Sequence, residues 1–212
     1  MTKVQQIAPG AFSFLCGFVN VFFLGSPGDP WVLVDAAVAG DERRIARAAE
    51  EIHGAGSRPE AILLTHGHGD HAGSAGRLSE LWDVPVYAHK LERPYLTGLC
   101  DYPPMDPTIG GLAGFASRFV PMARVNLGAR LIDLAEDGSL PVLADWKWLR
   151  AAGHTPGHTV FYCEKDGVLV AGDALTTLRL NSAAGNLLKK RIIHGPPEAT
   201  TTDWPEIGRA HV

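Results

Sequence analysis

The segment LLTHGHGDHAG, residues 63–73, places four side chains that can bind a metal ion within six consecutive positions. The four residues are His66, His68, Asp70 and His71. They directly follow an apolar run, AILLT, which is typical of a buried β-strand. Imidazole and carboxylate groups are common ligands of zinc, and the glycines between them leave room for a tight loop. The segment therefore predicts a strand that ends in a metal-binding loop.

The spacing of these donors predicts two sites rather than one. Residues two apart on an extended segment point to the same side, so His66 and His68 can bind one ion as a pair. Asp70 and His71 lie at the turn into the next helix, point elsewhere, and can begin a second site. The alternative interpretation is a polar loop whose histidines only cap the helix and form hydrogen bonds. Four donors in six positions argue against that alternative.

Two later segments offer further ligands. AAGHTPGHT, residues 151–159, places His154 and His158 on a turn between two strand patterns, and we expect one of them to complete the shell of the first ion. VLVAGDAL ends a hydrophobic strand with Asp173, a position suited to a carboxylate that bridges two cations. A Gly-Asp pair after a strand is also common in ordinary turns. The interpretation of Asp173 as a ligand therefore depends on the two histidine segments.

Hydrophobic patterns along the chain predict an α/β domain. A helix is expected at about residues 41–54, where apolar residues recur at spacings of three and four, and a second helix at 75–82. Strand patterns lie in the segments FVNVFFLG, WVLVDAA, AILLT, VPVYAH, RLIDL, WKWLRAA, TVFYCEK and GVLVAGDAL. His53, near the end of the first helix, is interpreted as a cationic partner of the helix dipole rather than a ligand.

Charge and composition limit the partners that we expect. Nineteen Lys and Arg residues against 23 Asp and Glu residues leave a formal charge of -4, so no basic field is available for nucleic acid or anionic lipid. The longest apolar stretch, residues 12–25, is shorter than the ~20 residues of a membrane helix and fits two strands joined by a bend. Three widely spaced cysteines and no export signal favour a reducing compartment. We therefore expect a cytoplasmic protein with a small-molecule substrate, no nucleic acid and no membrane partner, and an undetermined oligomeric state.

The motif THGHGDH resembles the HxHxDH signature of the metallo-β-lactamase superfamily, and GHTPGHT and GDAL are similar to its next two motifs. The resemblance spans nearly the whole chain, from LVDAA to HGPP. It implies an α/β fold with four layers, an αβ/βα sandwich in which two sheets pack face to face between outer helices. The metal site would lie at one edge of the sandwich. On this basis we expect a single domain over residues 1–212.

The resemblance also implies a role for each candidate ligand. The first metal ion would be bound by His66, His68 and His154, the second by Asp70 and His71, and both by a bridging Asp173. His158 would lie just outside the ligands, and Asp35 in LVDAA would brace the site through hydrogen bonds. We expect two Zn²⁺ ions, with iron or manganese as alternatives.

The function that follows is hydrolysis at a carbonyl group. A water shared by two zinc ions has a pKa lowered toward ~7, so that a metal-bound hydroxide can attack a small ester, thioester or lactone. Asp70 is the candidate catalytic residue, because its carboxylate can orient this nucleophile or move its proton. Asp173 stands where one β-lactamase branch has a cysteine ligand, which favours the glyoxalase II and lactonase branches.

Two other functions are compatible with these motifs. Persulfide dioxygenases and other oxygen-using members of the superfamily hold iron with similar residues. An inactive metal-binding remnant is the second alternative, because the superfamily supplies a last histidine from a loop after the bridging aspartate. Only His194 and His211 follow Asp173 here. We interpret His194 as a loop residue and expect the second site to hold zinc less tightly than the first.

The second half of the expected sandwich is incomplete. Residues 200–212, TTTDWPEIGRAHV, begin like a capped helix, with Thr202 or Asp203 as the N-cap, and end after about two turns. We interpret the chain as truncated at its C-terminus, with 206–212 as a non-native tail, because one codon choice for these residues resembles a sequencing-library adapter. Residues 96–127 are expected to form a loop insertion near the active site. The candidate substrate wall consists of Tyr95, Tyr102, Met105, Phe115 and Phe119.

Overall fold

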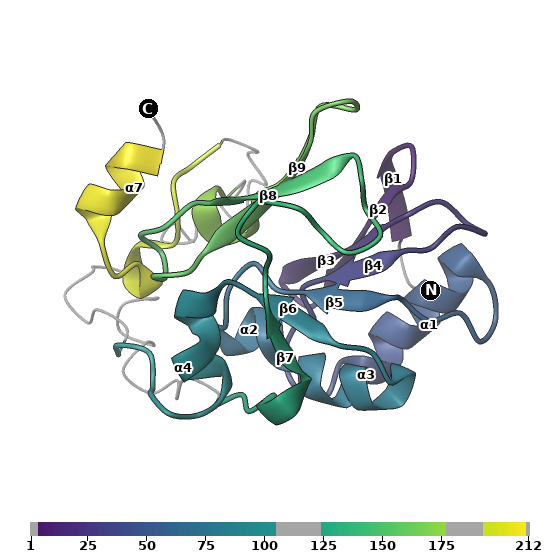
Figure 1. Cartoon of the computed structure of the whole chain (residues 1–212), viewed down its shortest axis with the longest axis horizontal. Helices are drawn as coiled ribbons and strands as arrows, with labels where there is room; N and C mark the ends of the chain where they lie inside the picture. Colours follow the sequence, from purple (N-terminus) through teal and green to yellow (C-terminus); the bar gives the residue numbers. More distant parts are fainter. Residues whose placement is uncertain (1–3, 105–123, 177–192, 211–212) are drawn as a thin grey trace.

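The computed structural model of this chain contains two β-sheets that pack face to face, and helices cover the outer side of the larger sheet (Figure 1). The structure describes residues 4–104, 124–176 and 193–210. None of the helices in these ranges is both long and apolar enough to cross a membrane. The three cysteines are free thiols, as the sequence predicted.

The larger sheet has seven strands among the described residues, and they lie side by side in chain order. They are β1 (Val4–Ala8), β2 (Ala11–Cys16), β3 (Val19–Leu24), β4 (Val32–Val34), β5 (Ala61–Leu63), β6 (Val86–Ala88) and β7 (Leu131–Asp133). Strands β1 to β4 pair antiparallel, and β4 to β7 pair parallel. The carboxyl ends of β4, β5 and β6 therefore lie at one edge of the sheet, where ligand sites form in such folds.

The smaller sheet consists, among the described residues, of β8 (Trp146–Arg150), β9 (Thr159–Cys163) and β10 (Val168–Val170). Strand β9 lies in the middle and is antiparallel to both neighbours. The beginning of β9 and the ends of β8 and β10 therefore lie at the same edge. The predicted histidine turn between two strands is confirmed, since residues 151–158 join β8 to β9.

The described residues form five α-helices and four short 3-10 helices. They are α1 (Glu42–His53), α2 (Gly69–Ala72), α3 (Ala75–Trp82), α4 (Arg93–Leu96) and α7 (Trp204–Ala210), with short 3-10 helices η1 (Lys90–Glu92), η2 (Gly128–Arg130), η3 (Gly172–Ala174) and η4 (Glu198–Thr200). The two helices predicted at 41–54 and 75–82 are confirmed as α1 and α3. Asp203 caps α7 as expected, because its Oδ1 accepts a hydrogen bond of 3.0 Å from the backbone N–H of Glu206.

Two apolar cores hold these layers together. The first lies between the large sheet and the helices α1 and α3, and it includes Ile45, Ala48, Ile62, Leu78 and Val86. The second lies between the two sheets, and it includes Val34, Leu63, Leu134, Phe161 and Val170. Removing such side chains from water contributes ~1.5–3 kcal/mol each and fixes the sheets face to face. The predicted α/β sandwich is therefore confirmed.

One sequence interpretation in this part of the fold is wrong. The ring of His53 stacks on Trp31, with ring centroids 4.3 Å apart, and neither ring nitrogen has a hydrogen-bond partner among the described residues. Burial lowers the pKa of His53 to about 4, so the imidazole is neutral at pH 7. It cannot act as a cationic partner of the α1 dipole. Its role is packing against the edge of the first core.

The neutral state of His53 predicts a specific acid sensitivity. In the unfolded chain its pKa is ~6.5, so between that value and about 4 the unfolded chain binds more protons than the folded one. The stability due to neutral His53 is therefore complete above pH ~6.5 and is lost as the pH falls toward 4. We expect His53→Phe, which keeps the stacking, to show a fall in melting temperature from pH 7 to pH 5 roughly 2–4 °C smaller than that of the parent. This difference in melting temperature is smaller than the full pKa shift would give, because the ring of His53 is partly exposed and solvent screens its charge. Equal falls in the two proteins would show that another group is responsible.

Candidate metal centre

The predicted ligand segments meet at the edge that the two sheets share. Thr65 lies in the loop after β5, two residues beyond the end of the strand, and the first residue of β9 is Thr159. The backbone N–H of Thr159 donates a 2.8 Å hydrogen bond to the carbonyl oxygen of Thr65, which joins the two sheets directly beside the histidines. We call residues 66–68 the first ligand loop and residues 154–158 the second ligand loop.

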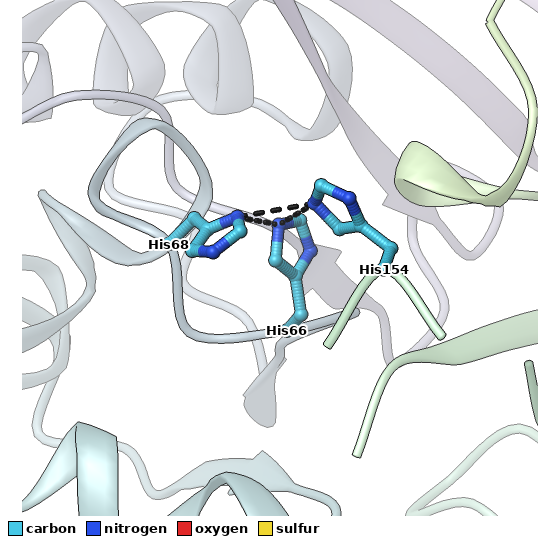
Figure 2. A group of neighbouring side chains, drawn as sticks. All are labelled: His66, His68 and His154. Atoms are coloured by element: carbon cyan, nitrogen blue, oxygen red, sulfur yellow. Dashed lines mark hydrogen bonds between the residues drawn. The ribbon is translucent and has the colours of Figure 1, made fainter. Parts of the chain in front are cut away.

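Three imidazole nitrogens converge between these loops (Figure 2). His66 Nε2 lies 3.0 Å from His68 Nδ1, and His154 Nε2 lies 3.2 Å from His66 Nε2 and 3.1 Å from His68 Nδ1. Tetrahedral zinc with Zn–N bonds of ~2.0–2.1 Å places its nitrogen ligands about 3.3 Å apart. The triangle of nitrogens therefore has the dimensions of three corners of such a coordination shell.

Burial keeps these three imidazoles neutral. Burial lowers the pKa of His66 and of His154 well below the usual value, and it lowers that of His68 to about 4. Neutral imidazole nitrogens that face one another present lone pairs, which repel unless a cation lies between them. The electrostatics of the group therefore fit a metal ion better than a proton.

Thr65 orients the first of these ligands. Its hydroxyl lies 2.9 Å from Asp35 Oδ2 and 3.0 Å from His66 Nδ1. Because a carboxylate only accepts, the hydroxyl donates to Asp35, and we infer that His66 Nδ1–H donates to the hydroxyl oxygen. This tautomer leaves the lone pair of His66 Nε2 directed at the other two histidines.

A second group of converging atoms contains His66, His71 and Asp173, whose ligand atoms all lie within 4.8 Å of one another. Asp173 spans both groups, since its Oδ1 lies 3.3 Å from His71 Nε2 and its Oδ2 lies 3.3 Å from His154 Nε2. A carboxylate in this position can hold one oxygen toward each of two cations. The bridging role remains a prediction, and this geometry is compatible with it.

The charge around His71 is negative. Burial by itself lowers the pKa of His71, but the carboxylates of Asp173 and Asp35 raise it well above the usual value. The charge of His71 in turn keeps the pKa of Asp173 low despite burial. The carboxylates thus favour a positive charge here, whether a proton or a metal ion supplies it.

Asp35 braces the site, as the resemblance implied. Its side chain is buried at the end of β4, and its Oδ1 accepts a 2.8 Å hydrogen bond from the backbone N–H of Thr65. Its Oδ2 lies 2.8 Å from His71 Nδ1, while the other ring nitrogen, Nε2, faces Asp173 Oδ1 at 3.3 Å. The backbone of Asp35 has a φ of 59°, a strained conformation for a residue with a side chain. Such strain is typical of functional sites.

Asp70, the candidate catalytic residue, lies at the rim of the centre. Its Oδ2 is 4.0 Å from His71 Nε2, its side chain is about one third exposed at 35%, and it belongs to neither group of converging atoms among the described residues. Its role as a ligand therefore stays a prediction. His158 lies deeper, where its Nε2 accepts a 3.1 Å hydrogen bond from the backbone N–H of Asp173. Burial lowers the pKa of His158 to about 3, so it can keep this acceptor role at neutral pH.

Two histidines, His194 and His211, follow Asp173 in the chain. His194 forms an isolated antiparallel bridge with Thr176 and belongs to neither group of converging atoms in the described part of the chain. It is a loop residue, as the sequence predicted. His211 lies outside the described residues. The weaker second site therefore remains a prediction.

Sequence reasoning missed several polar residues that support the centre. Thr201 lies 3.4 Å through its Oγ1 from His154 Nδ1, and Glu92 hydrogen-bonds both ligand loops. Thr65 directly precedes the histidine motif, so its position was a usable signal. No motif marks Glu92 or Thr201. Of the candidate substrate wall, Tyr95 and Tyr102 stack beside the centre with ring centroids 4.0 Å apart, whereas Met105, Phe115 and Phe119 lie outside the described residues.

Similarity to known proteins agrees with this geometry. The chain is 39% identical over 201 residues to "Probable metallo-hydrolase YflN" of Bacillus subtilis (strain 168), which covers 93% of this chain and 76% of that protein. It is 33% identical over 159 residues to "Probable metallo-hydrolase YybB" of the same organism, covering 75% of this chain and 63% of that protein.

Solved structures show the same fold. The crystal structure of TTHA1623 in a di-iron-bound form has a TM-score of 0.60 at 22% identity, covering 100% of this chain and 83% of that one. The BLEG-1 B3 metallo-beta-lactamase has a TM-score of 0.59 at 23% identity, covering 99% of this chain and 83% of that one. Residues 15–187 match the family described as the Metallo-beta-lactamase superfamily. The chain therefore belongs to the metallo-beta-lactamase superfamily.

Proposed function

We propose that this protein is a zinc-dependent hydrolase that uses two metal ions to cleave a small ester, thioester or lactone. The observation that carries the proposal is the convergence of His66 Nε2, His68 Nδ1 and His154 Nε2 within 3.2 Å of one another. The carboxylate of Asp173 extends this group toward His71, which supports a second ion. The names of the two Bacillus relatives as probable metallo-hydrolases support the same class of reaction.

The residues of the centre have three proposed roles: to bind the metal ions, to orient the ligand rings and to transfer a proton. Zinc ions, when bound, supply a Lewis acid for the carbonyl oxygen and lower the pKa of water toward ~7. His66, His68 and His154 would hold the first ion with neutral imidazoles, while hydrogen bonds with Thr65 and Asp35 orient the rings of His66 and His71. Asp70, partly exposed at the rim, is placed to orient the attacking water or to accept its proton. The same exposure leaves its carboxylate accessible to a substrate.

The substrate is proposed to be a small carbonyl compound that reaches the centre from the side of the stacked tyrosines. The ring of Tyr102 lies 4.5 Å from that of His68, measured between centroids, and Tyr95 stacks on Tyr102. Two aromatic rings next to the ligands offer an apolar surface for an acyl group. The identity of that group awaits a substrate screen.

The test combines metal content with turnover. Protein purified without added metal is analysed for zinc, iron and manganese, then assayed on aryl esters, acyl thioesters, lactones and a β-lactam. We expect about two zinc ions per chain at full loading and hydrolysis of at least one carbonyl class, lost with a chelator and restored by zinc. The first ion should bind more tightly than the second.

Two results would contradict the proposal. Purified protein that contains iron and consumes oxygen with a persulfide substrate would move the function to oxygen chemistry. Protein that is fully loaded with zinc and hydrolyses none of the four substrate classes would identify a metal-binding protein without this activity.

A further inference from the structure

A single buried carboxylate joins the two ligand loops. Glu92 ends the short helix η1, which follows β6 at the edge where the metal centre lies, and its side chain is 0% exposed. Its Oε2 accepts hydrogen bonds from the backbone N–H of Gly67, at 3.0 Å, and from the hydroxyl of Tyr102. Its Oε1 accepts from the hydroxyl of Thr155, at 2.8 Å, and from the backbone N–H of Gly157, at 2.7 Å.

Three of these four donors belong to the two loops that carry the three-histidine group. Gly67 lies between the two histidines of the first ligand loop, and Thr155 and Gly157 lie in the second ligand loop. The three residues are 25, 63 and 65 positions away from Glu92 in the chain. One side chain therefore connects segments that only the tertiary fold brings together, and each of these three bonds is made within three residues of His66, His68 or His154.

The close approach of Glu92 and Tyr102 to the two ligand loops depends on a glycine in each loop. A Cβ at position 157 would lie 2.8 Å from Glu92 Cγ, and one at position 67 would lie 2.4 Å from the Tyr102 hydroxyl oxygen. Burial raises the pKa of Glu92, although four hydrogen bonds oppose this and favour the ionised form. A buried carboxylate is costly unless its acceptor sites are used, and here both oxygens have two donors each.

We propose that Glu92 is a positioning residue that sets the distance between the two ligand loops and thereby the affinity of the three-histidine group for its metal ion. The proposal rests on the metal site proposed above. Glu92 itself does not contact the converging nitrogens. It acts through the backbone of the loops, whose spacing decides whether His154 Nε2 reaches the nitrogens of His66 and His68.

Glu92→Gln tests this role with almost no change in size. Each oxygen of Glu92 accepts one backbone N–H and one hydroxyl. A glutamine has one acceptor oxygen and one NH₂ group, and hydroxyls can rotate to accept from that NH₂ group, but a backbone N–H cannot. Whichever way the amide lies, either Gly67 or Gly157 loses its backbone bond to the side chain at position 92, and Gly67 then keeps only its 3.0 Å bond to the Tyr102 hydroxyl.

The measurement is zinc affinity of metal-free protein, by competition with a chromophoric chelator, together with the visible spectrum of the cobalt-substituted form. We expect Glu92→Gln to bind the first ion about 10- to 100-fold more weakly and to change the cobalt spectrum. The matched control is Glu136→Gln, an exposed glutamate bonded to Lys90 Nζ, which should match the parent in both readouts. The melting temperature of the metal-free protein separates a loss of stability from a loss of affinity.

The results distinguish a failure of the positioning role from a failure of the proposed function. Unchanged zinc affinity and an unchanged cobalt spectrum in Glu92→Gln, with or without a lower melting temperature, would overturn the positioning role alone. A parent protein that binds no zinc would overturn the proposed function as well. If Glu92→Gln does not fold, Thr155→Val and Tyr102→Phe each remove one hydroxyl donor and keep the backbone N–H bonds of Gly67 and Gly157 to Glu92. We expect each to weaken zinc binding by about 2- to 10-fold, and unchanged affinity in both would count against the proposal.

Discussion

Replacing His66 by alanine is expected to abolish metal binding at the three-histidine group and to reduce hydrolysis by at least about 10³-fold. The reason is geometric, because His66 Nε2 lies 3.0 and 3.2 Å from the other two histidines, and among the described residues His66 is shared with the group that contains His71 and Asp173. Its loss should affect both ions. The measurements are zinc content after gel filtration and kcat/KM on the best substrate of the screen.

A histidine outside the centre provides the control for this experiment. His53→Phe keeps its stacking on Trp31 and should retain full zinc content and kcat/KM at pH 7. The metal-free forms of the parent and His66→Ala should both show a cooperative thermal transition, because the core residues between sheet and helices are untouched. Retained turnover in a folded His66→Ala protein would show that the reaction takes place elsewhere.

Replacing Asp173 by asparagine is expected to remove one of the two ions and to lower hydrolysis by about 10²-fold or more. The carboxylate oxygens lie 3.3 Å from His71 Nε2 and 3.3 Å from His154 Nε2, and an amide keeps the shape but not the charge. Zinc content should fall from about two ions to about one per chain. In the metal-free protein the pKa of His71 should also fall, because the charge of Asp173 raises it, and NMR titration of the ring can follow this change.

Two further Asp→Asn variants show whether the expected loss of zinc is specific to Asp173. Asp137→Asn changes an exposed side chain that bonds only Ser139 in the described contacts, and it should leave zinc content and turnover unchanged. Asp70→Asn addresses the candidate catalytic residue at the rim. If Asp173→Asn keeps two ions with unchanged affinity while Asp70→Asn loses one, the bridging assignment is wrong and Asp70 is the more important ligand.

Local structure was predictable from the sequence, because it depends on neighbours in the chain. Helices α1 and α3 follow from apolar residues that recur every three or four positions, and β5 follows from an apolar run that ends at Thr65. The same local logic placed His154 and His158 on a turn between strands. The strand pattern WKWLRAA likewise matches β8, whose Trp146 packs against the second core between the sheets.

Interactions between distant segments were not predictable. His53 ends a helix, where a cationic role is common, but the structure stacks it on Trp31 and its ring is neutral. Glu92 sits in the unremarkable segment KLERP, and its partners lie up to 65 positions away. Asp70 is part of the dense motif, yet its carboxylate ends 4.0 Å from His71. Motif spacing specifies which donors are available and does not specify where their atoms lie.

The sequence by itself therefore predicted the candidate donors and determined the α/β class and the superfamily, since these depend on residue types and on short-range patterns. The tertiary structure decided which donor atoms converge. His66 and His154 are 88 positions apart, and their nitrogens lie 3.2 Å apart because the second core holds the two sheets face to face. Glu92 adds a second constraint at the same edge by bonding both ligand loops. A metal site of this kind depends on separations of a few tenths of an ångström, which only the packed fold can set.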